Sequence, residues 1–200
     1  METSSIKAGI LKFYDYSEAA PTVPALIQQR KKISLDAFYH VLYQLNDSCP
    51  QQKHFMGYNL YARDGSVLSL PSDLIADNPE DYSYTKRKSQ SDYYQLHINA
   101  LYDLANRRYV DTVIHPRKGN QERDAFIEML ERNQWNKKSI FVADRGYEGY
   151  GLIFKIMEKG AFFVIRVKDN AKGGILKGIQ LPDAEEYDFE ITKKFTTRDN

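Results

Sequence analysis

Cysteine is nearly absent from this chain of 200 residues, and its scarcity excludes one class of fold. The single cysteine, Cys49, cannot form an internal disulfide, so a disulfide-stabilised secreted fold is ruled out. Four histidines and no Cys-x-x-Cys pair also argue against a zinc site. These absences favour an intracellular protein.

Long apolar runs and a strong net charge are missing too. No run approaches the ~18 apolar residues of a membrane span, and the N-terminus lacks the apolar core of a signal peptide. A net charge of +1 gives no strong overall field, so attraction to phosphates would have to come from local basic clusters. What is present, 42% hydrophobic residues and 15 tyrosines, is typical of a soluble globular protein with one main core.

The first half of the chain predicts helices followed by antiparallel strands. Apolar residues recur at helical spacing from Ala25 to Asn46, which indicates two short helices. Strand-like residues flank Asp64-Gly65, a dipeptide that favours a tight turn and so predicts a β-hairpin. The polar, proline-containing stretch 71–92 predicts a long loop, and the β-rich runs 94–103 and 107–116 predict a second hairpin.

The second half alternates helices with strands. Residues 120–133 predict an amphipathic helix with Asn120 as its cap. The runs 139–143 and 161–167 are almost continuously apolar, as fully buried strands are, and a helix ending at Gly160 lies between them. These segments form a parallel βαβ unit, and a further strand is expected from Tyr187. The fold class is therefore α/β, with a mixed sheet of antiparallel hairpins followed by a parallel extension, and an N-terminal helical arm.

Two aspartates are candidate metal ligands. Asp144 follows the buried strand 139–143, and the carboxyl ends of parallel strands open into the crevice where α/β folds bind ligands. In this interpretation Asp64 ends the first strand, which a mixed sheet could set beside the strand of Asp144 despite a separation of 144 − 64 = 80 positions. Two such carboxylates suit Mg²⁺ or Mn²⁺ and would support phosphoryl transfer.

Each of these residues also has a plainer explanation. Asp64-Gly65 is ordinary hairpin chemistry, and Asp144 could cap the helix that follows it. Glu148, one helical turn beyond Asp144, could join it, but an acid in the first turn of a helix is favoured by the helix dipole alone. Basic clusters could contact DNA phosphates, although such residues on loops are usually solvated. These clusters are Arg30-Lys31-Lys32, Lys86-Arg87-Lys88, Arg107-Arg108 and Arg117-Lys118.

Three segments resemble bacterial insertion-sequence transposases of the DDE class, specifically the IS-four family. They read YARDGSVLSLP, QLHINALYDLANRRYVDT and FVADRGYEGYGLIFKIMEKGAFFVIRVKD, within about positions 25 to 170. The resemblance implies an RNase H-like core, DNA cleavage and strand transfer, and a divalent metal, Mg²⁺ or Mn²⁺, held by two aspartates and one glutamate. Asp64 matches the family's first acid and Asp144 the second.

The same resemblance implies further contacts and partners. Arg145, Gly146 and Tyr147 complete the motif around Asp144, and we expect Arg145, Tyr147 and the cluster Lys86-Arg87-Lys88 to bind DNA. The DNA would be the terminal inverted repeats and the target. A homodimer of the full-length protein, in the bacterial cytoplasm and associated with the nucleoid rather than a membrane, is also implied.

The family's third acid lies in a Tyr-x2-Arg-x3-Glu-x6-Lys motif beyond a mostly β insertion. No glutamate of this sequence has arginine four positions before it and tyrosine seven positions before it. We therefore expect a truncated chain, with a helical region over 1–50, an incomplete catalytic core over 51–170 and the start of the insertion over 171–200. Because a missing carboxylate removes ligand charge and geometry, we expect no transposition by this chain alone.

Two other functions remain open. One is a non-catalytic transposase remnant that binds DNA or dimerises. The other is an RNase H-like nuclease that uses water as its only nucleophile and joins no DNA.

Overall fold

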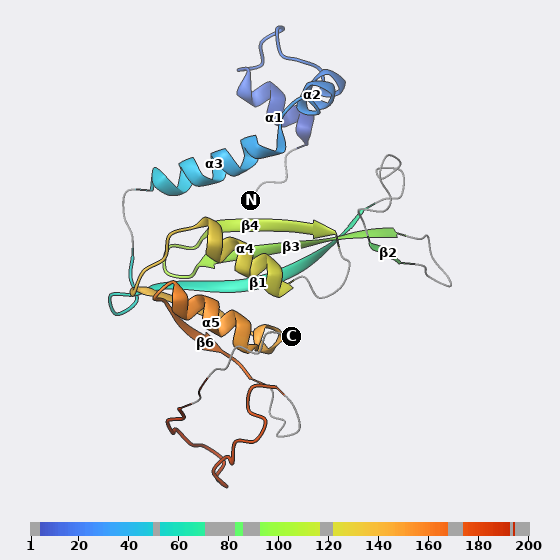
Figure 1. Ribbon diagram of the computed structural model, residues 1–200. Helices are drawn as coiled ribbons and strands as arrows, with labels where there is room; N and C mark the ends of the chain where they lie inside the picture. The colour runs from blue at the N-terminus through green and yellow to red at the C-terminus, as the bar shows by residue number, and fades with distance from the viewer. Residues whose placement is uncertain are drawn as a thin grey trace. The chain divides into compact units, whose positions relative to one another are not determined.

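The computed structural model describes residues 5–49, 53–70, 83–85, 93–116, 122–167, 174–192 and 194. The chain forms two compact units, Met1–Ser48 and Cys49–Asn200 (Figure 1). None of the helices in the described ranges is long and apolar enough to cross a membrane.

The first unit, as described from residue 5 onward, contains three helices: α1 (Ile6–Phe13), α2 (Val23–Arg30) and α3 (Leu35–Asp47). The helices begin after the capping residues Ser5, Thr22 and Ser34. The side-chain oxygen of each cap accepts one backbone N–H at 3.3 Å, from Ala8, Ala25 and Asp36 respectively. Such caps satisfy a donor that the first helical turn leaves unpaired. The predicted helical arm and its two helices within 25–46 are confirmed, and α1 is an addition.

The described residues of the second unit form a mixed sheet of six strands. The strands are β1 (Asn59–Leu70), β2 (Ser83–Thr85), β3 (Tyr93–Asp103), β4 (Arg108–Pro116), β5 (Ser139–Ala143) and β6 (Phe162–Ile165). β3 pairs antiparallel with β1, β2 and β4, whereas β1 and β6 pair parallel with β5. The predicted order, antiparallel strands followed by a parallel βαβ unit, is confirmed.

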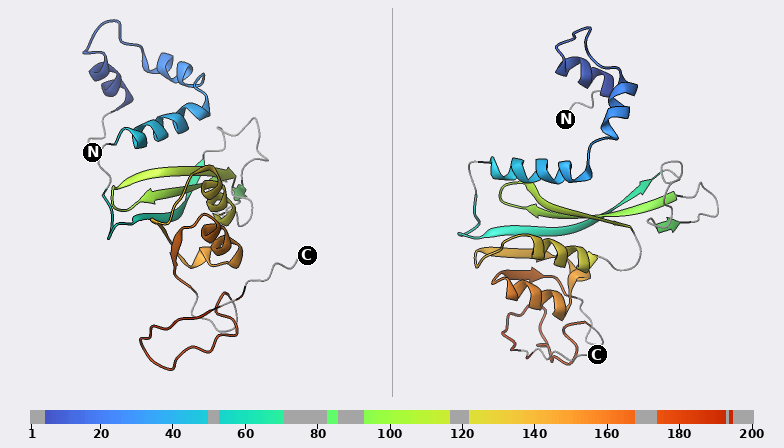
Figure 2. Two further views of the ribbon diagram at one scale, coloured as in Figure 1. Left: turned by 60° about the vertical axis from the view of Figure 1, so that its left-hand side comes forward. Right: turned by 45° about the horizontal axis from the view of Figure 1, so that its top comes forward.

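Helices α4 (Glu122–Arg132) and α5 (Tyr150–Glu158) cover the same face of this sheet (Figure 2). α4 buries Phe126, Met129 and Leu130 in one core cluster with Phe141 of β5 and Ile156 of α5. Full burial of such side chains contributes about 1.5–3 kcal/mol each. The apolar stripe that predicted α4 is therefore the one that packs on the sheet, and the predicted cap Asn120 lies outside the described residues.

The predicted hairpin at Asp64-Gly65 is wrong. β1 runs straight through this dipeptide, and Gly65 pairs with Asn99 of β3. The space beside Gly65 is occupied, because a Cβ there would lie 2.6 Å from Nε2 of His97. Glycine is thus needed for the close approach of a neighbouring side chain and not for a turn. Asp64 accordingly lies inside a strand.

Three further expectations need correction. The predicted loop 71–92 contains the short strand β2, and its other residues lie outside the described ones. β6 is not fully buried: Phe162 and Val164 are 51% and 59% exposed because this strand lies at the end of the described sheet. The residues from Tyr187 to Thr192 form no strand.

Candidate active site

The parallel pairing of β1 with β5 brings Asp64 and Asp144 to neighbouring strands. The last pair in this register is Arg63 with Ala143, and each aspartate is the next residue of its chain segment. Asp144 keeps an extended backbone, with φ −79° and ψ 171°, so alternation points both carboxylates away from the face of Arg63 and Ala143. Both aspartates are exposed. The predicted adjacency of their strands is confirmed.

The two carboxylates have different surroundings. Oδ1 of Asp64 accepts the backbone N–H of Gly65 at 2.8 Å. Oδ1 of Asp144 lies 2.8 Å from Nε of Arg166, just beyond β6, in an ion pair whose side chains are 59% and 68% exposed. Asp144 makes no side-chain capping bond to the short helix η3 (Arg145–Tyr147) that follows it. The capping explanation for Asp144 therefore does not hold.

A buried arginine links the two segments that carry the aspartates. Arg63 is 3% exposed, and its guanidinium donates to the carbonyl oxygen of Asp64, to Oδ1 of Asn99 at 2.5 Å and to the carbonyl oxygen of Glu122 at 3.2 Å. Its Cζ lies 4.9 Å from the ring centre of Tyr147, within cation–π range. Burial lowers the pKa of Arg63, while Tyr147, Glu122 and Asp64 oppose that shift.

Sequence reasoning did not identify Arg63. The available signal was its place in a strand: it alternates with Tyr61 and Gly65 on one side of Asp64, so a strand through this stretch puts a cation on the helix-covered face. A charge there needs partners, and only the fold brings Asn99 and Tyr147 to it.

Tyr147 belongs to the core and not to the surface. Its side chain is 3% exposed and packs edge-on against Phe126, with ring centres 6.1 Å apart. Burial raises the pKa of Tyr147 to about 12; the Arg63 charge opposes this shift, and Glu122 and Asp64 add to it. The ring is therefore unavailable for the DNA contact predicted from the sequence.

The other predicted contacts have separate outcomes. Arg145 is exposed beside Asp144 and stays available to a ligand. Lys86, Arg87 and Lys88 lie outside the described residues. Glu148 is 6% exposed and precedes α5, so it is not in the first turn of that helix.

The donor set consists of two carboxylates. In the described part of the chain, no three histidine, cysteine, aspartate or glutamate side chains come together as a metal site, so Glu148 does not complete one. Two exposed carboxylates still match the way Mg²⁺ is often bound, through one or two carboxylates together with water and substrate phosphates.

The model of the transposase DDE domain family matches residues 56–199, a range that includes both aspartates, η3 and the whole described sheet. The chain belongs to this family. The match confirms the DDE resemblance and the transposase class, and it does not single out the IS-four family. No curated protein sequence matches the chain.

The chain is also similar to a solved structure, described as a cryo-EM structure of piggyBac transposase synaptic complex with hairpin DNA. The similarity covers 56% of this chain and 23% of the piggyBac chain, at 11% sequence identity and a TM-score of 0.38. The matched region thus spans less than a quarter of that protein.

Proposed function

We propose that this DDE domain acts in metal-dependent phosphoryl transfer on DNA, cleaving and joining strands at insertion-sequence ends. Asp64 and Asp144 are the ligands of Mg²⁺ or Mn²⁺ in this proposal. The observation that carries it is the register of β1 and β5, in which the two aspartates directly follow the paired residues Arg63 and Ala143. Family membership supports the same chemistry.

Each neighbouring side chain has a distinct task in this proposal. When bound, a divalent ion supplies Lewis-acid activation of an attacking oxygen and charge stabilisation at phosphorus. Arg63 holds the backbone of Asp64 and the ring of Tyr147, and so fixes the position of both acid-bearing segments. Arg166 neutralises Asp144 before the ion arrives. In this proposal Arg145, which is exposed and follows Asp144, contacts a phosphate of the bound DNA.

The third ligand of the family has no counterpart with the right spacing in this sequence. Strand transfer is therefore not expected from these 200 residues alone, and metal binding is the direct test. We expect a Mn²⁺ titration, monitored by electron paramagnetic resonance, to detect a binding site in the wild-type chain. Asp64→Asn or Asp144→Asn should lower the Mn²⁺ affinity of this site at least tenfold. Asp183→Asn, at an exposed aspartate, is the matched control. Equal Mn²⁺ affinity in all four proteins would refute the assignment.

A second candidate is a non-catalytic DNA-binding protein. It is favoured by the absence of a three-residue metal site among the described residues. It predicts that the double variant Asp64→Asn with Asp144→Asn keeps wild-type DNA affinity, with or without Mg²⁺. A metal-dependent gain in DNA affinity that the double variant loses would reject it.

A further inference from the structure

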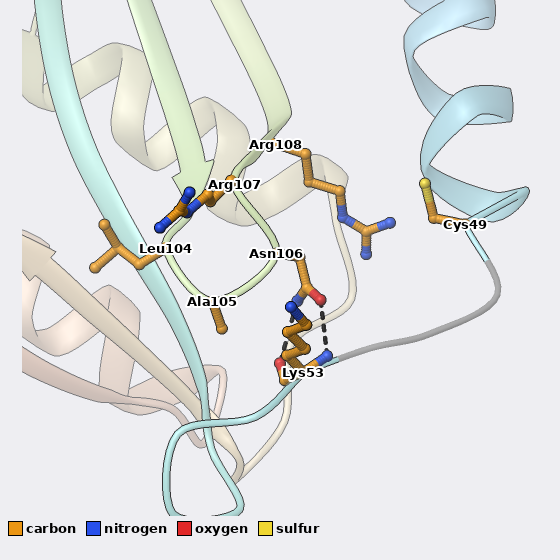
Figure 3. Close-up of a pocket in the computed structure, with 7 residues that line it drawn as sticks. All are labelled: Cys49, Lys53, Leu104, Ala105, Asn106, Arg107 and Arg108. Atoms are coloured by element: carbon orange, nitrogen blue, oxygen red, sulfur yellow. Dashed lines mark hydrogen bonds between the residues drawn. The ribbon is translucent and has the colours of Figure 1, made fainter.

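A basic pocket lies at the turn between β3 and β4. Its cavity of about 510 Å³ is lined by Lys53, which precedes β1, by the turn residues 104–107 and by Arg108, the first residue of β4, with Cys49 at its margin (Figure 3). None of these lining residues is acidic. The pocket is therefore a local positive region on a chain whose net charge is only +1.

Hydrogen bonds of the Asp103 and Asn106 side chains hold this pocket in shape. Asp103 is 3% exposed, and Oδ1 accepts the backbone N–H groups of Ala105 and Asn106, both at 3.1 Å. The Asn106 side chain accepts the N–H of Lys53 at 2.7 Å and donates to the carbonyl oxygen of Lys53 at 3.1 Å, as the dashed lines in Figure 3 show. The turn and the segment before β1 are thus joined, and these hydrogen bonds hold the backbone that carries the cationic side chains.

Arg107 has an uncommon backbone conformation. Its φ is +56°, in the left-handed region that residues other than glycine, asparagine and aspartate rarely adopt. Residues held in such sparsely populated conformations cluster at active sites and ligand-binding segments. Glycine or asparagine would relieve this strain, so an exposed arginine here suggests a use for its charge.

The charges of the pocket are unequal. Three cations, Lys53, Arg107 and Arg108, line the pocket, and among the described residues Asp103 pairs with Arg108, with Oδ2 3.7 Å from Nε. Within the described part of the chain, neither Lys53 nor Arg107 forms an ion pair. Guanidinium groups match phosphate oxygens in a bidentate manner, and a lysine adds a point charge. The matching ligand is a phosphate group.

We propose that this pocket binds a backbone phosphate of DNA and so positions the duplex on the DDE domain, an inference that rests on the proposed function. The turn is tied to the amino end of β1, since the N–H of Leu104 donates to the carbonyl oxygen of Leu60 at 2.9 Å. Asp64 lies four residues further along this strand, about 13 Å away at 3.3 Å per residue. About four base pairs of DNA cover that length at 3.4 Å each.

The test compares DNA affinity at several salt concentrations. Fluorescence anisotropy with a labelled duplex is measured for the wild-type chain and for Lys53→Gln with Arg107→Gln, two exposed residues outside the proposed metal site. Losing a phosphate contact should weaken binding about tenfold and reduce the slope of log affinity against log salt by about 1. Lys177→Gln with Lys194→Gln, also exposed, removes the same charge elsewhere and should change both values less. Equal losses in the two double variants would overturn the proposal.

A titration with inorganic phosphate distinguishes a DNA backbone phosphate from a free anion as the ligand of the pocket. In NMR titrations of the full chain, phosphate should shift the amide signals of Asn106, Arg107 and Arg108 in the wild type and not in the pocket variant. Shifts together with wild-type DNA affinity of the pocket variant would mean a site for free anions only, which overturns the assignment to DNA. Thermal unfolding of both double variants verifies that they are folded.

The two proposals can fail separately. If the pocket variant binds DNA more weakly and Asp64→Asn leaves the Mn²⁺ affinity unchanged, the pocket is supported and the metal site is rejected. The reverse result, normal DNA affinity of the pocket variant with loss of Mn²⁺ in Asp64→Asn, would reject the pocket alone.

Discussion

The guanidinium of Arg63 lies 4.9 Å from the ring centre of Tyr147 and joins the strand of Asp64 to the short helix that follows Asp144. The contact is enclosed, because both side chains are 3% exposed. Burying a charge is costly unless it is paired or hydrogen-bonded. The two terminal nitrogens of Arg63 donate to three oxygen acceptors besides the ring contact, whereas its Nε has no hydrogen-bond partner among the described residues. The geometry of the exposed acids therefore depends on a cation beneath them.

Replacing Arg63 with lysine should destabilise the second unit and weaken metal binding. An ammonium group cannot reach the oxygens of Asp64, Asn99 and Glu122 and also stack on the ring. We expect a loss of about 3 kcal/mol in the free energy of unfolding, measured in urea with the fluorescence of the single tryptophan, Trp135, which packs against the core. Mn²⁺ affinity should fall as well.

Arg123→Lys is the matched control for this change. Arg123 lies in the first turn of α4 and donates an exposed hydrogen bond to the carbonyl oxygen of Gly146 at 3.2 Å. Its replacement should cost less than about 1 kcal/mol. A similar loss of unfolding free energy in both variants would show that the buried contacts of Arg63 stabilise the unit no more than the exposed hydrogen bond of Arg123 does.

Gly65→Ala should destabilise the same unit through a steric clash. The added methyl group would meet Nε2 of His97 at 2.6 Å and Oδ1 of Asn99 at 3.4 Å, and His97 is also held 3.3 Å from Glu122. Overpacking of this kind costs about 1–3 kcal/mol. Gly151→Ala, in α5 with no atom within 4 Å, should be neutral or stabilising. Urea midpoints of the two variants that coincide would contradict this expectation.

The parts of the fold that sequence predicts are those in which local pattern and tertiary environment agree. The apolar face of residues 122–132 packs on the sheet, and the run 139–143 becomes a buried parallel strand. Asp64-Gly65 is different. Its turn propensity is a local preference, and it stabilises the chain less than the ten residue pairs that β1 forms with β3. A second long-range pairing, that of β1 with β5, sets Asp64 beside Asp144, and no local pattern in the sequence encodes its register.

Burial is the second quantity that sequence could not give. β6 is as apolar as β5, but only β5 has a neighbour on both sides in the described sheet. Tyr147 follows an exposed arginine and a glycine, and its motif suggested a surface role, whereas the fold places its ring between Arg63 and Phe126. These contacts join residues that are far apart in the chain, and a periodic pattern in the sequence does not reveal such contacts.

Arg166→Gln should strengthen metal binding. Arg166 forms an ion pair with Asp144 at 2.8 Å, and a cation bound to that carboxylate has to replace it. An exposed pair of this kind is worth at most about 1 kcal/mol, so its removal should tighten Mn²⁺ binding by up to about fivefold. Lys177→Gln, which also removes one exposed charge, should leave the affinity within twofold. Weaker binding by Arg166→Gln would mean that the arginine supports the site in another way.

Tyr147 should make the second unit less stable at high pH. Its pKa is about 12 in the folded chain, against 10.0 for an unperturbed tyrosine, chiefly because burial disfavours the phenolate. The folded state therefore holds this proton more tightly than the unfolded state does. The resulting stabilisation is fully present below pH 10 and is lost as the pH rises from about 10 to 12, at on the order of 1 kcal/mol per pH unit.

Tyr147→Phe removes this titration while keeping the ring over which Arg63 lies. We expect the urea midpoint of the variant to fall less steeply between pH 10 and 12 than that of the wild type. Part of the slope should remain, because burial also raises the pKa of Tyr61. Tyr109→Phe, at a side chain that is 58% exposed, should keep the wild-type slope. If the urea midpoint of Tyr147→Phe falls with pH as steeply as that of the wild type, the Tyr147 phenol does not stay protonated in the folded chain through this range. Burial of the ring would then not govern its titration.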